Sequence, residues 1–253
     1  MTGIHNVFLA GIGGTGIVTV NQVLGMAALR AGLHVEGLDQ TGLSQKAGPV
    51  TSHLRLSHAR ADRSNRVSPG SADCVLAFDL LTAVDVQNVG LADPNKTIAV
   101  ASTSKTPTGE MVYDVAAEYP SDDSRLSRLD VRSKSLTAFD ALAAADALFG
   151  TTLSANFLLV GAAYQAGALP IPAAAIEEAI AINGVAVAAN QAAFRWGRVA
   201  VADPVAFRSA TAAPTEAPHS DAVVPTHLLT NCSVAGTTRE LLGRLAAGLV
   251  AYQ

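Results

Sequence analysis

The feature that most constrains the fold is a glycine-rich loop near the start of the chain. The short apolar run "HNVFLA" (5–10) is typical of a buried strand, and Gly11, Gly13 and Gly16 follow it in G-x-G-x-x-G spacing. From residue 15 to residue 31, apolar side chains recur at helical spacing. A strand, a tight glycine turn and a helix in this order favour an α/β fold with a phosphate-binding type of turn.

The rest of the chain continues the alternation of strands and helices. Apolar runs predict strands at 33–39, 50–57, 73–79 and 96–102, with a turn at 40–49, a helical stretch at 80–90 and a short strand within 106–113. Helical periodicity then predicts four segments, at 137–149, 154–167, 172–182 and 185–201. We therefore expect an open, mostly parallel, Rossmann-like sheet with flanking helices and a helical C-terminal portion.

Composition divides the chain into three parts. Residues 1–208 carry the α/β pattern and form the expected main domain. Residues 209–226 are rich in proline, alanine and threonine, which predicts a linker. Residues 227–253 form a tail with an amphipathic segment at 237–253. Within the main domain, the alternation in strand 50–57 predicts that His53 and Arg55 share its more exposed face.

The glycine loop leaves three interpretations open. It fits a dinucleotide-binding turn, and Glu36 and Asp39 lie where an acid that binds a ribose would be expected. It also fits another phosphate-bearing ligand, because a helix N-terminus offers unpaired N–H groups. Alternatively, the glycines only allow a strand and a helix to pack closely. The second predicted strand runs directly into a glycine-bounded loop, without the crossover helix that a dinucleotide fold needs there.

A second stretch is more specific. "LDQTGLSQKAGPVTSHLRLS" (38–57), taken with the glycine loop, resembles the gamma-type domain of 2-oxoacid:ferredoxin oxidoreductases. The family pattern T/S-G-x-x-Q-K/R-G-G-x-V-x-S-x-V-R is matched from Thr41 to Arg55, with departures at Ala47 and Pro49. Further similarity, closest to the indolepyruvate type, occurs at 78–85, 106–112, 156–180 and 183–198.

The resemblance implies a subunit that is not catalytic alone. It implies that this domain contributes the coenzyme A side of an active centre, while partner subunits hold thiamine diphosphate, magnesium and iron–sulfur clusters. Electrons would leave through ferredoxin or another acceptor. No catalytic residue or metal ligand is expected in this chain. The residues expected to bind the co-substrate are Gly11, Gly13, Gly14, Thr15, Gly16, Thr41, Gly42, Gln45, Lys46, His53 and Arg55.

Composition agrees with an incomplete enzyme and excludes some other classes. A net charge of −4 argues against a general nucleic-acid binder, and no apolar run approaches the ~20 residues of a membrane span. The chain has no C-x-x-C pair for a cluster, no thiamine diphosphate cradle, and six histidines without metal-ligand spacing. Cys74 and Cys232 are far apart, as expected of reduced thiols in a cytoplasmic protein.

Two other functional classes remain open from the sequence. The first is a free-standing NAD- or FAD-dependent oxidoreductase built on the glycine loop and Asp39. The second is a non-catalytic assembly protein that kept the fold for its interfaces, which the low content of charged residues, 15%, would suit. Phe194 and Trp196 are expected to be packing anchors, since each lies within a helical pattern.

Overall fold

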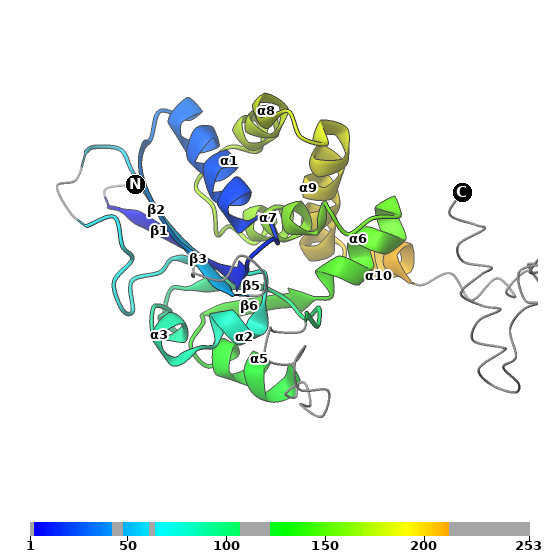
Figure 1. The fold of residues 1–253 in the computed structure, drawn as a ribbon, viewed down its shortest axis with the longest axis horizontal. Coiled ribbons are helices and arrows are strands. Elements are labelled where there is room, and N and C mark those ends of the chain that lie inside the picture. Colours follow the sequence, from blue (N-terminus) through cyan, green and yellow to red (C-terminus); the bar gives the residue numbers. More distant parts are fainter. Residues whose placement is uncertain (1–2, 42–47, 61–63, 107–121, 213–253) are drawn as a thin grey trace, which may run out of the picture. The chain divides into compact units, whose positions relative to one another are not determined.

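A six-stranded sheet forms the centre of the computed structural model, which describes residues 3–41, 48–60, 64–106 and 122–212 (Figure 1). Its strands are adjacent in the order β2-β3-β1-β4-β5-β6. β3 is antiparallel to both of its neighbours, whereas β1, β4, β5 and β6 are parallel to one another. The strands are β1 (His5–Ile12), β2 (His34–Thr41), β3 (Pro49–Ser57), β4 (Cys74–Ala77), β5 (Ile98–Ser102) and β6 (Ser135–Phe139).

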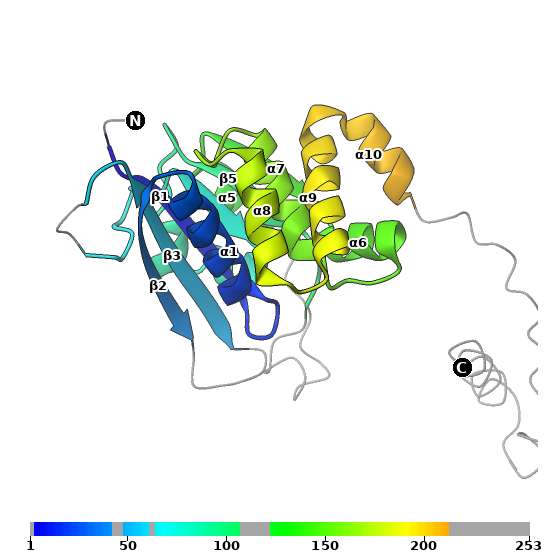
Figure 2. The ribbon, with the colours of Figure 1, turned by 90° about the horizontal axis from the view of Figure 1, so that it is seen from above.

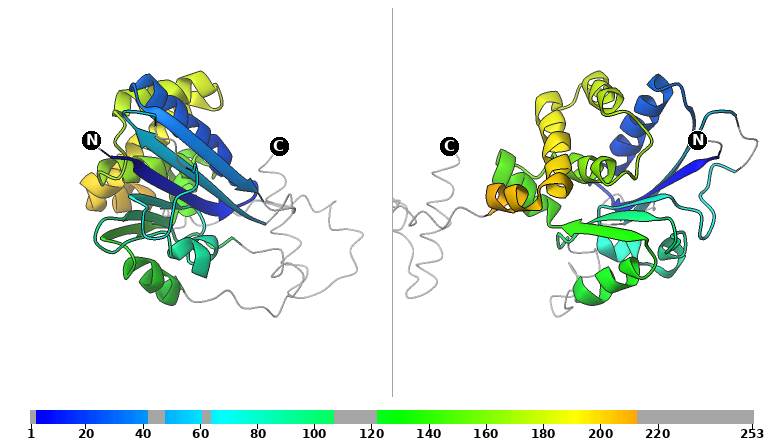
Figure 3. Two further views of the ribbon diagram at one scale, coloured as in Figure 1. Left: turned by 90° about the vertical axis from the view of Figure 1, so that its left-hand side faces the viewer. Right: turned by 180° about the vertical axis from the view of Figure 1, so that it is seen from behind.

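Helices cover both faces of this sheet (Figures 1 and 3). One layer contains α1 (Ile17–Arg30), α6 (Ala141–Phe149), α7 (Ala155–Gln165), α8 (Ala173–Asn183) and α9 (Val187–Ala202), with α10 (Pro204–Thr211) packed on α6 and α9. The other layer contains α2 (Leu80–Ala83), α3 (Val86–Val89) and α5 (Asp122–Asp130). No helix in the described ranges is long and apolar enough to cross a membrane.

Side-chain alternation along the strands builds two separate cores. In β1, Val7 and Leu9 enter the core under the larger helical layer, while Phe8 and Ala10 enter the core under the smaller one. Successive side chains of a strand point to opposite faces, so a strand that is apolar throughout must be covered on both sides. The expected α/β class and the mostly parallel sheet are confirmed.

Several boundaries differ from the expectations. Residues 135–139 form the edge strand β6 rather than the start of a helix, and Asp140 then caps α6 by accepting a hydrogen bond from the N–H of Ala143. The helical stretch at 80–90 is two single turns, which begin after Asp79 and Asp85. α10 continues to Thr211, three residues into the range expected to be a linker. The expected strand within 106–113 and the segment 237–253 lie outside the described residues, apart from residue 106.

β3 is buried more deeply than the sequence predicted. It lies between β2 and β1, α1 packs on one of its faces, and Phe8 and Val67 cover His53 on the other, so the expected half-exposed strand is wrong. His53 is only 1% exposed and its ring lies 5.1 Å from that of Phe8. Its Nδ1 accepts a hydrogen bond from the N–H of Val67 at 3.2 Å, so Nε2 carries the proton toward Oε1 of Gln40 at 3.1 Å. The histidine is thus a neutral core residue.

α7 and α9 cross at two glycines. A Cβ added to Gly161 would overlap the main-chain carbonyl of Phe194, with its carbon at 2.9 Å. A Cβ added to Gly197 would overlap the main-chain carbonyl of Leu158 in the same way, with its carbon at 2.7 Å. The two helix backbones are therefore in direct contact, and Phe194, fully buried beside this crossing, is the packing anchor that the sequence predicted.

We predict that Gly197→Ala lowers the free energy of unfolding by about 2–3 kcal/mol, because the new methyl group meets backbone rather than a side chain that can move. Gly25→Ala is the matched control: it is also within a helix, but its Cβ would lie at an ordinary 3.5 Å from Val35. Since both changes gain up to about 1 kcal/mol of helix propensity, the difference isolates the close crossing. Equal urea midpoints for the two variants would contradict this.

A second prediction concerns the dependence of stability on pH. Burial, with a smaller effect of the Arg66 charge, lowers the pKa of His53 from 6.5 to about 4. The unfolded chain therefore binds a proton that the folded protein excludes between these two values. The stabilisation is complete above pH 6.5 and is lost as the pH falls toward 4, up to about 3 kcal/mol. Denaturation curves at pH 7 and pH 4.5 should show this loss in the wild type and a smaller loss in His53→Gln, with exposed His58→Gln as control.

Candidate functional site

The glycine turn lies at the point where the chain changes from one helical layer to the other. β1 leads through this turn into α1 in the larger layer, whereas the adjacent parallel strand β4 leads into α2 in the smaller layer. In open α/β sheets, ligands bind at such a switch point, beyond the carboxyl ends of the strands. The position of the turn therefore agrees with a ligand site.

Some of the hydrogen-bond donors of the glycine turn already bind main-chain carbonyls of the protein. The N–H of Gly13 donates to the carbonyl of Gly48 at 2.8 Å. The N–H and the hydroxyl of Thr15 both donate to the carbonyl of Ile12, at 3.2 Å and 2.6 Å. Two of the N–H groups from Gly13 to Gly16 therefore have protein partners.

The N–H of Gly16 is oriented differently from the N–H groups of Gly13 and Thr15. The side-chain amide of Asn156, in the first turn of α7, donates to the carbonyl of Thr15. In a trans peptide the C=O and N–H groups point in opposite directions, so the N–H of Gly16 points away from Asn156. Gly14 and Gly16 are both exposed, and both have positive φ values, +91° and +77°. The turn thus presents the N–H of Gly16 and the beginning of α1 on its open side.

Gly11 has a packing role instead. A Cβ at this position would lie 2.6 Å from the end of the Ile17 side chain and 3.0 Å from Cβ of Phe78. Gly16 is constrained in a similar way, since a Cβ there would lie 2.9 Å from the amide nitrogen of Asn156. The close-packing interpretation therefore holds for Gly11 in full and for Gly16 in part, whereas Gly14 has open space around it.

The second motif reaches the same end of the sheet. Thr41, the last residue of β2, pairs with Val50, and Gly11 of β1 pairs with Val50 on its other side. Together with the bond between Gly13 and Gly48, this register brings both ends of the 42–48 loop beside the glycine turn. Gly42, Gln45 and Lys46 lie outside the described residues.

Arg55 does not belong to this end of the sheet. It pairs with Asn6 at the beginning of β1, about 17 Å along the strand from Gly11. Its Nε donates to Oδ1 of Asn6 at 3.1 Å, and its Nη1 donates to the carbonyl of Ser64. Arg55, expected to bind the co-substrate together with the glycine turn, therefore lies at the other end of the sheet, and His53, in the core, does not reach the turn either.

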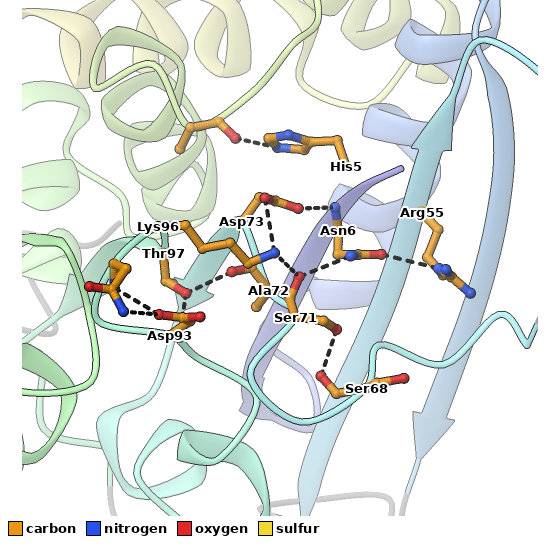
Figure 4. A network of polar contacts seen from close by, with 12 residues as sticks. His5, Asn6, Arg55, Ser68, Ser71, Ala72, Asp73, Asp93, Lys96 and Thr97 are labelled. Atoms are coloured by element: carbon orange, nitrogen blue, oxygen red, sulfur yellow. Dashed lines mark hydrogen bonds and ion pairs between the residues drawn. The ribbon is translucent and has the colours of Figure 1, made fainter. Parts of the chain in front are cut away.

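A network of hydrogen bonds and an ion pair surrounds Arg55 at the end of the sheet opposite the glycine turn (Figure 4). Asn6 accepts from Arg55, and its main-chain N–H and side-chain amide donate to Asp73 and to the carbonyl of Ser71, at 2.8 and 2.9 Å. Lys96 donates to the same carbonyl and pairs with Asp73. These partners lie at the amino ends of β1 and β4, where satisfied polar groups stabilise the fold rather than bind ligands.

Sequence reasoning missed Asp79, which lies beside the turn. It lies two residues after the end of β4, is 2% exposed, and its N–H donates to the carbonyl of Ala10 at 3.4 Å. Its Oδ1 accepts from the N–H and the hydroxyl of Thr82, which caps α2, while Oδ2 has no hydrogen-bond partner among the described residues. Burial raises the pKa of Asp79. An acid directly after an apolar strand was the signal that could have found it.

Asp39 is not placed to bind a dinucleotide. In that fold the acidic residue ends the strand next to β1, but here β3 lies between β1 and β2. Asp39 is therefore about 10 Å from β1 rather than about 5 Å. Its Oδ1 instead accepts from Oγ of Ser52 and from the amide of Asn21, the latter at 2.8 Å.

Other polar chemistry is sparse in the described part of the chain. Its side chains contain no group of three or more His, Cys, Asp or Glu that could hold a metal ion. Cys74 is fully buried in β4, and burial raises the pKa of its thiol, so it behaves as a small apolar side chain.

Comparisons with known proteins agree with these features. The family model described as "Pyruvate ferredoxin/flavodoxin oxidoreductase" matches residues 6–200. "Indolepyruvate oxidoreductase subunit IorB" of Pyrococcus horikoshii is 31% identical over 199 residues, which cover 76% of this chain and 94% of the relative.

Solved structures share the fold. The gamma subunit of keto/oxoacid ferredoxin oxidoreductase from Geobacter sulfurreducens superposes with a TM-score of 0.54 and 19% identity, over 78% of this chain and 98% of that chain. A longer protein, 2-oxoglutarate:ferredoxin oxidoreductase from Magnetococcus marinus with 2-oxoglutarate, coenzyme A and succinyl-CoA bound, gives a TM-score of 0.58 at 18% identity. That match covers 79% of this chain and 31% of the longer one. By the extent of the family match, the chain belongs to the pyruvate ferredoxin/flavodoxin oxidoreductase family.

Proposed function

We propose that this chain is a gamma-type subunit and forms the coenzyme A side of an active centre that converts a 2-oxoacid, of the indolepyruvate or aryl-pyruvate type, to an acyl-CoA. Partner subunits hold thiamine diphosphate with magnesium and the iron–sulfur clusters, and electrons pass to ferredoxin or another acceptor. The complex is cytoplasmic, which is compatible with the free thiol of Cys74. The observation that carries the proposal is the open glycine turn at the switch point of a chain that belongs to this family.

The residues of the turn fit a diphosphate group. The N–H of Gly16 and the first N–H groups of α1 point to the open side of the turn, and the helix N-terminus adds a partial positive charge. Gly14 leaves room for close approach, since a Cβ there would meet no atom within 4 Å. Gly13 and Thr15 shape the turn through their bonds to Gly48 and Ile12 rather than contacting the ligand.

This chain then positions a co-substrate and performs no bond-breaking step itself. Thiamine diphosphate, bound in a partner, supplies the carbanion chemistry that decarboxylation of a 2-oxoacid needs. The turn would hold the phosphates of coenzyme A, so that its thiol reaches the neighbouring subunit. Lys46 and Gln45, in the loop whose two ends lie beside the turn, are proposed as further contacts to the phosphates.

The assembled complex tests this function. We expect the chain, purified with its natural partners, to bring thiamine diphosphate and iron, and to reduce an acceptor only when a 2-oxoacid and coenzyme A are both present. The isolated chain should show no turnover. A bound flavin or nicotinamide without partner chains would instead support the dinucleotide enzyme, and partner chains without any cofactor would support the assembly protein.

Substitution at the turn tests the coenzyme A site. We expect Gly14→Ala to weaken coenzyme A binding to the complex at least tenfold, about 1.4 kcal/mol, because the methyl group enters the open side and the left-handed backbone is strained. Gly32→Ala, at the other end of α1, is the matched control: its φ is +76° and its Cβ would also meet no atom within 4 Å. Isothermal titration and thermal unfolding should be measured on both complexes.

Both variants carry a similar backbone strain, so both should lose some thermal stability. Only Gly14→Ala should lose affinity for coenzyme A. Equal coenzyme A affinities in the two folded complexes would refute the role of the turn, whatever the effect on melting temperature.

A further inference from the structure

An open groove of about 550 Å³ is lined by residues of α1, α8 and the edge strand β2, and none of its lining residues belongs to the glycine turn. In Figure 2, α1 lies between β2 and α8. Its walls are mostly apolar. The lining side chains that matter here are Val23, Met26 and Leu29 of α1, Val35 of β2, Leu54 of β3 and Ile182 of α8. β2 forms this edge of the described sheet, so the groove lies beside an edge strand.

The rim of the groove exposes large apolar side chains. Met26 is 41% exposed, Leu29 56% and Ile182 51%. These residues come from two helices and gather around one hollow. An apolar patch of this kind on a soluble chain marks an interaction surface more often than a free surface.

The groove has one carboxylate on its lining. Asp39 is the only acidic residue among the described residues that line it, and these include no lysine or arginine. Glu177 and Glu178 of α8 do not line the groove and are paired with Arg195 and Arg30. The surface is therefore an apolar hollow with one carboxylate, and it complements a partner segment that carries a basic residue among apolar ones.

Hydrogen bonds hold the Asp39 carboxylate in place on the lining of the groove. Its Oδ1 is held by Ser52 and by Asn21, which is only 6% exposed. The Asp39 side chain lines the groove, and the residue is exposed as a whole. Oδ1 of Asn21 is buried and has no hydrogen-bond partner among the described residues. The polar end of the groove thus offers a carboxylate whose position is set from behind, as a recognition group needs.

We propose that this groove docks a segment of a partner subunit that inserts a lysine or arginine beside Asp39 and apolar side chains between α1 and α8. The inference rests on the proposed function, which requires partner subunits. The longer relative supports it, because this chain matches only 31% of that polypeptide, and the remainder is there joined to the matched region. In the proposed function this chain is a subunit of its own, which needs a docking surface where the longer chain has a covalent connection.

Site-directed photocrosslinking on the assembled complex tests the inference. p-Benzoylphenylalanine is placed at position 29 or 182, on the groove, and at position 131 as the control. Val131 is 69% exposed and follows α5 in the opposite helical layer. We expect crosslinks from positions 29 and 182 to one segment of the partner subunit that contains Lys or Arg, at least tenfold above the yield from position 131.

The charge is tested separately. Asp39→Asn should weaken association with the partner at least fivefold and reduce its dependence on salt, while thermal unfolding of the isolated chain changes little. Glu36→Gln is the matched control, because it removes the same charge from the opposite face of β2, and it should change association less than twofold.

The outcomes separate this inference from the proposed function. An intact complex with thiamine diphosphate but no crosslink at the groove overturns the docking site alone. Crosslinks to a second copy of this chain or to residues 213–253 overturn it as well, as does a partner segment without Lys or Arg. Absence of any partner subunit overturns both proposals.

Discussion

The insertion of β3 between β1 and β2 is the constraint on which the rest of the structure depends. β3 is antiparallel to both of its neighbours. Its first residues and the last residues of β2 therefore lie at the same end of the sheet as the glycine turn. The bond between Gly13 and Gly48 joins these two segments. The same insertion buries β3 on both faces and separates Asp39 from β1. One change in strand order therefore brings a second loop to the turn and removes the geometry of a dinucleotide site.

The glycine turn combines packing with recognition. Gly11 is required by contact with Ile17 and Phe78, and Gly16 must leave space for Asn156. Asn156 in turn fixes the peptide that presents the N–H of Gly16. A helix far along the sequence, α7, thus sets the direction of a donor in the first loop. The close crossing of α7 and α9 at two glycines helps to hold that helix in place.

Polar side chains are divided between the two ends of the sheet. At the amino ends, Arg55, Asn6, Asp73 and Lys96 bind one another and main-chain carbonyls. Such a closed network leaves few donors for a ligand. At the carboxyl ends, the turn keeps exposed donors and the buried Asp79 keeps an oxygen without a described partner. The groove beside β2 lies at neither end, and its apolar rim suits a protein surface rather than a phosphate.

The sequence by itself determined the α/β class, the strand–turn–helix at the start, most of the later helices and the family. Periodicity and glycine spacing are local patterns, so they can be recognised without knowing which strands are neighbours in the sheet. The order of the strands in the sheet decided where the expected site residues lie. Arg55 lies in the family motif but at the far end of β3, and His53 is on the expected face but is covered by Phe8 and by Val67 of a distant loop. Such outcomes depend on which strands become neighbours, and local patterns do not encode pairing between distant segments.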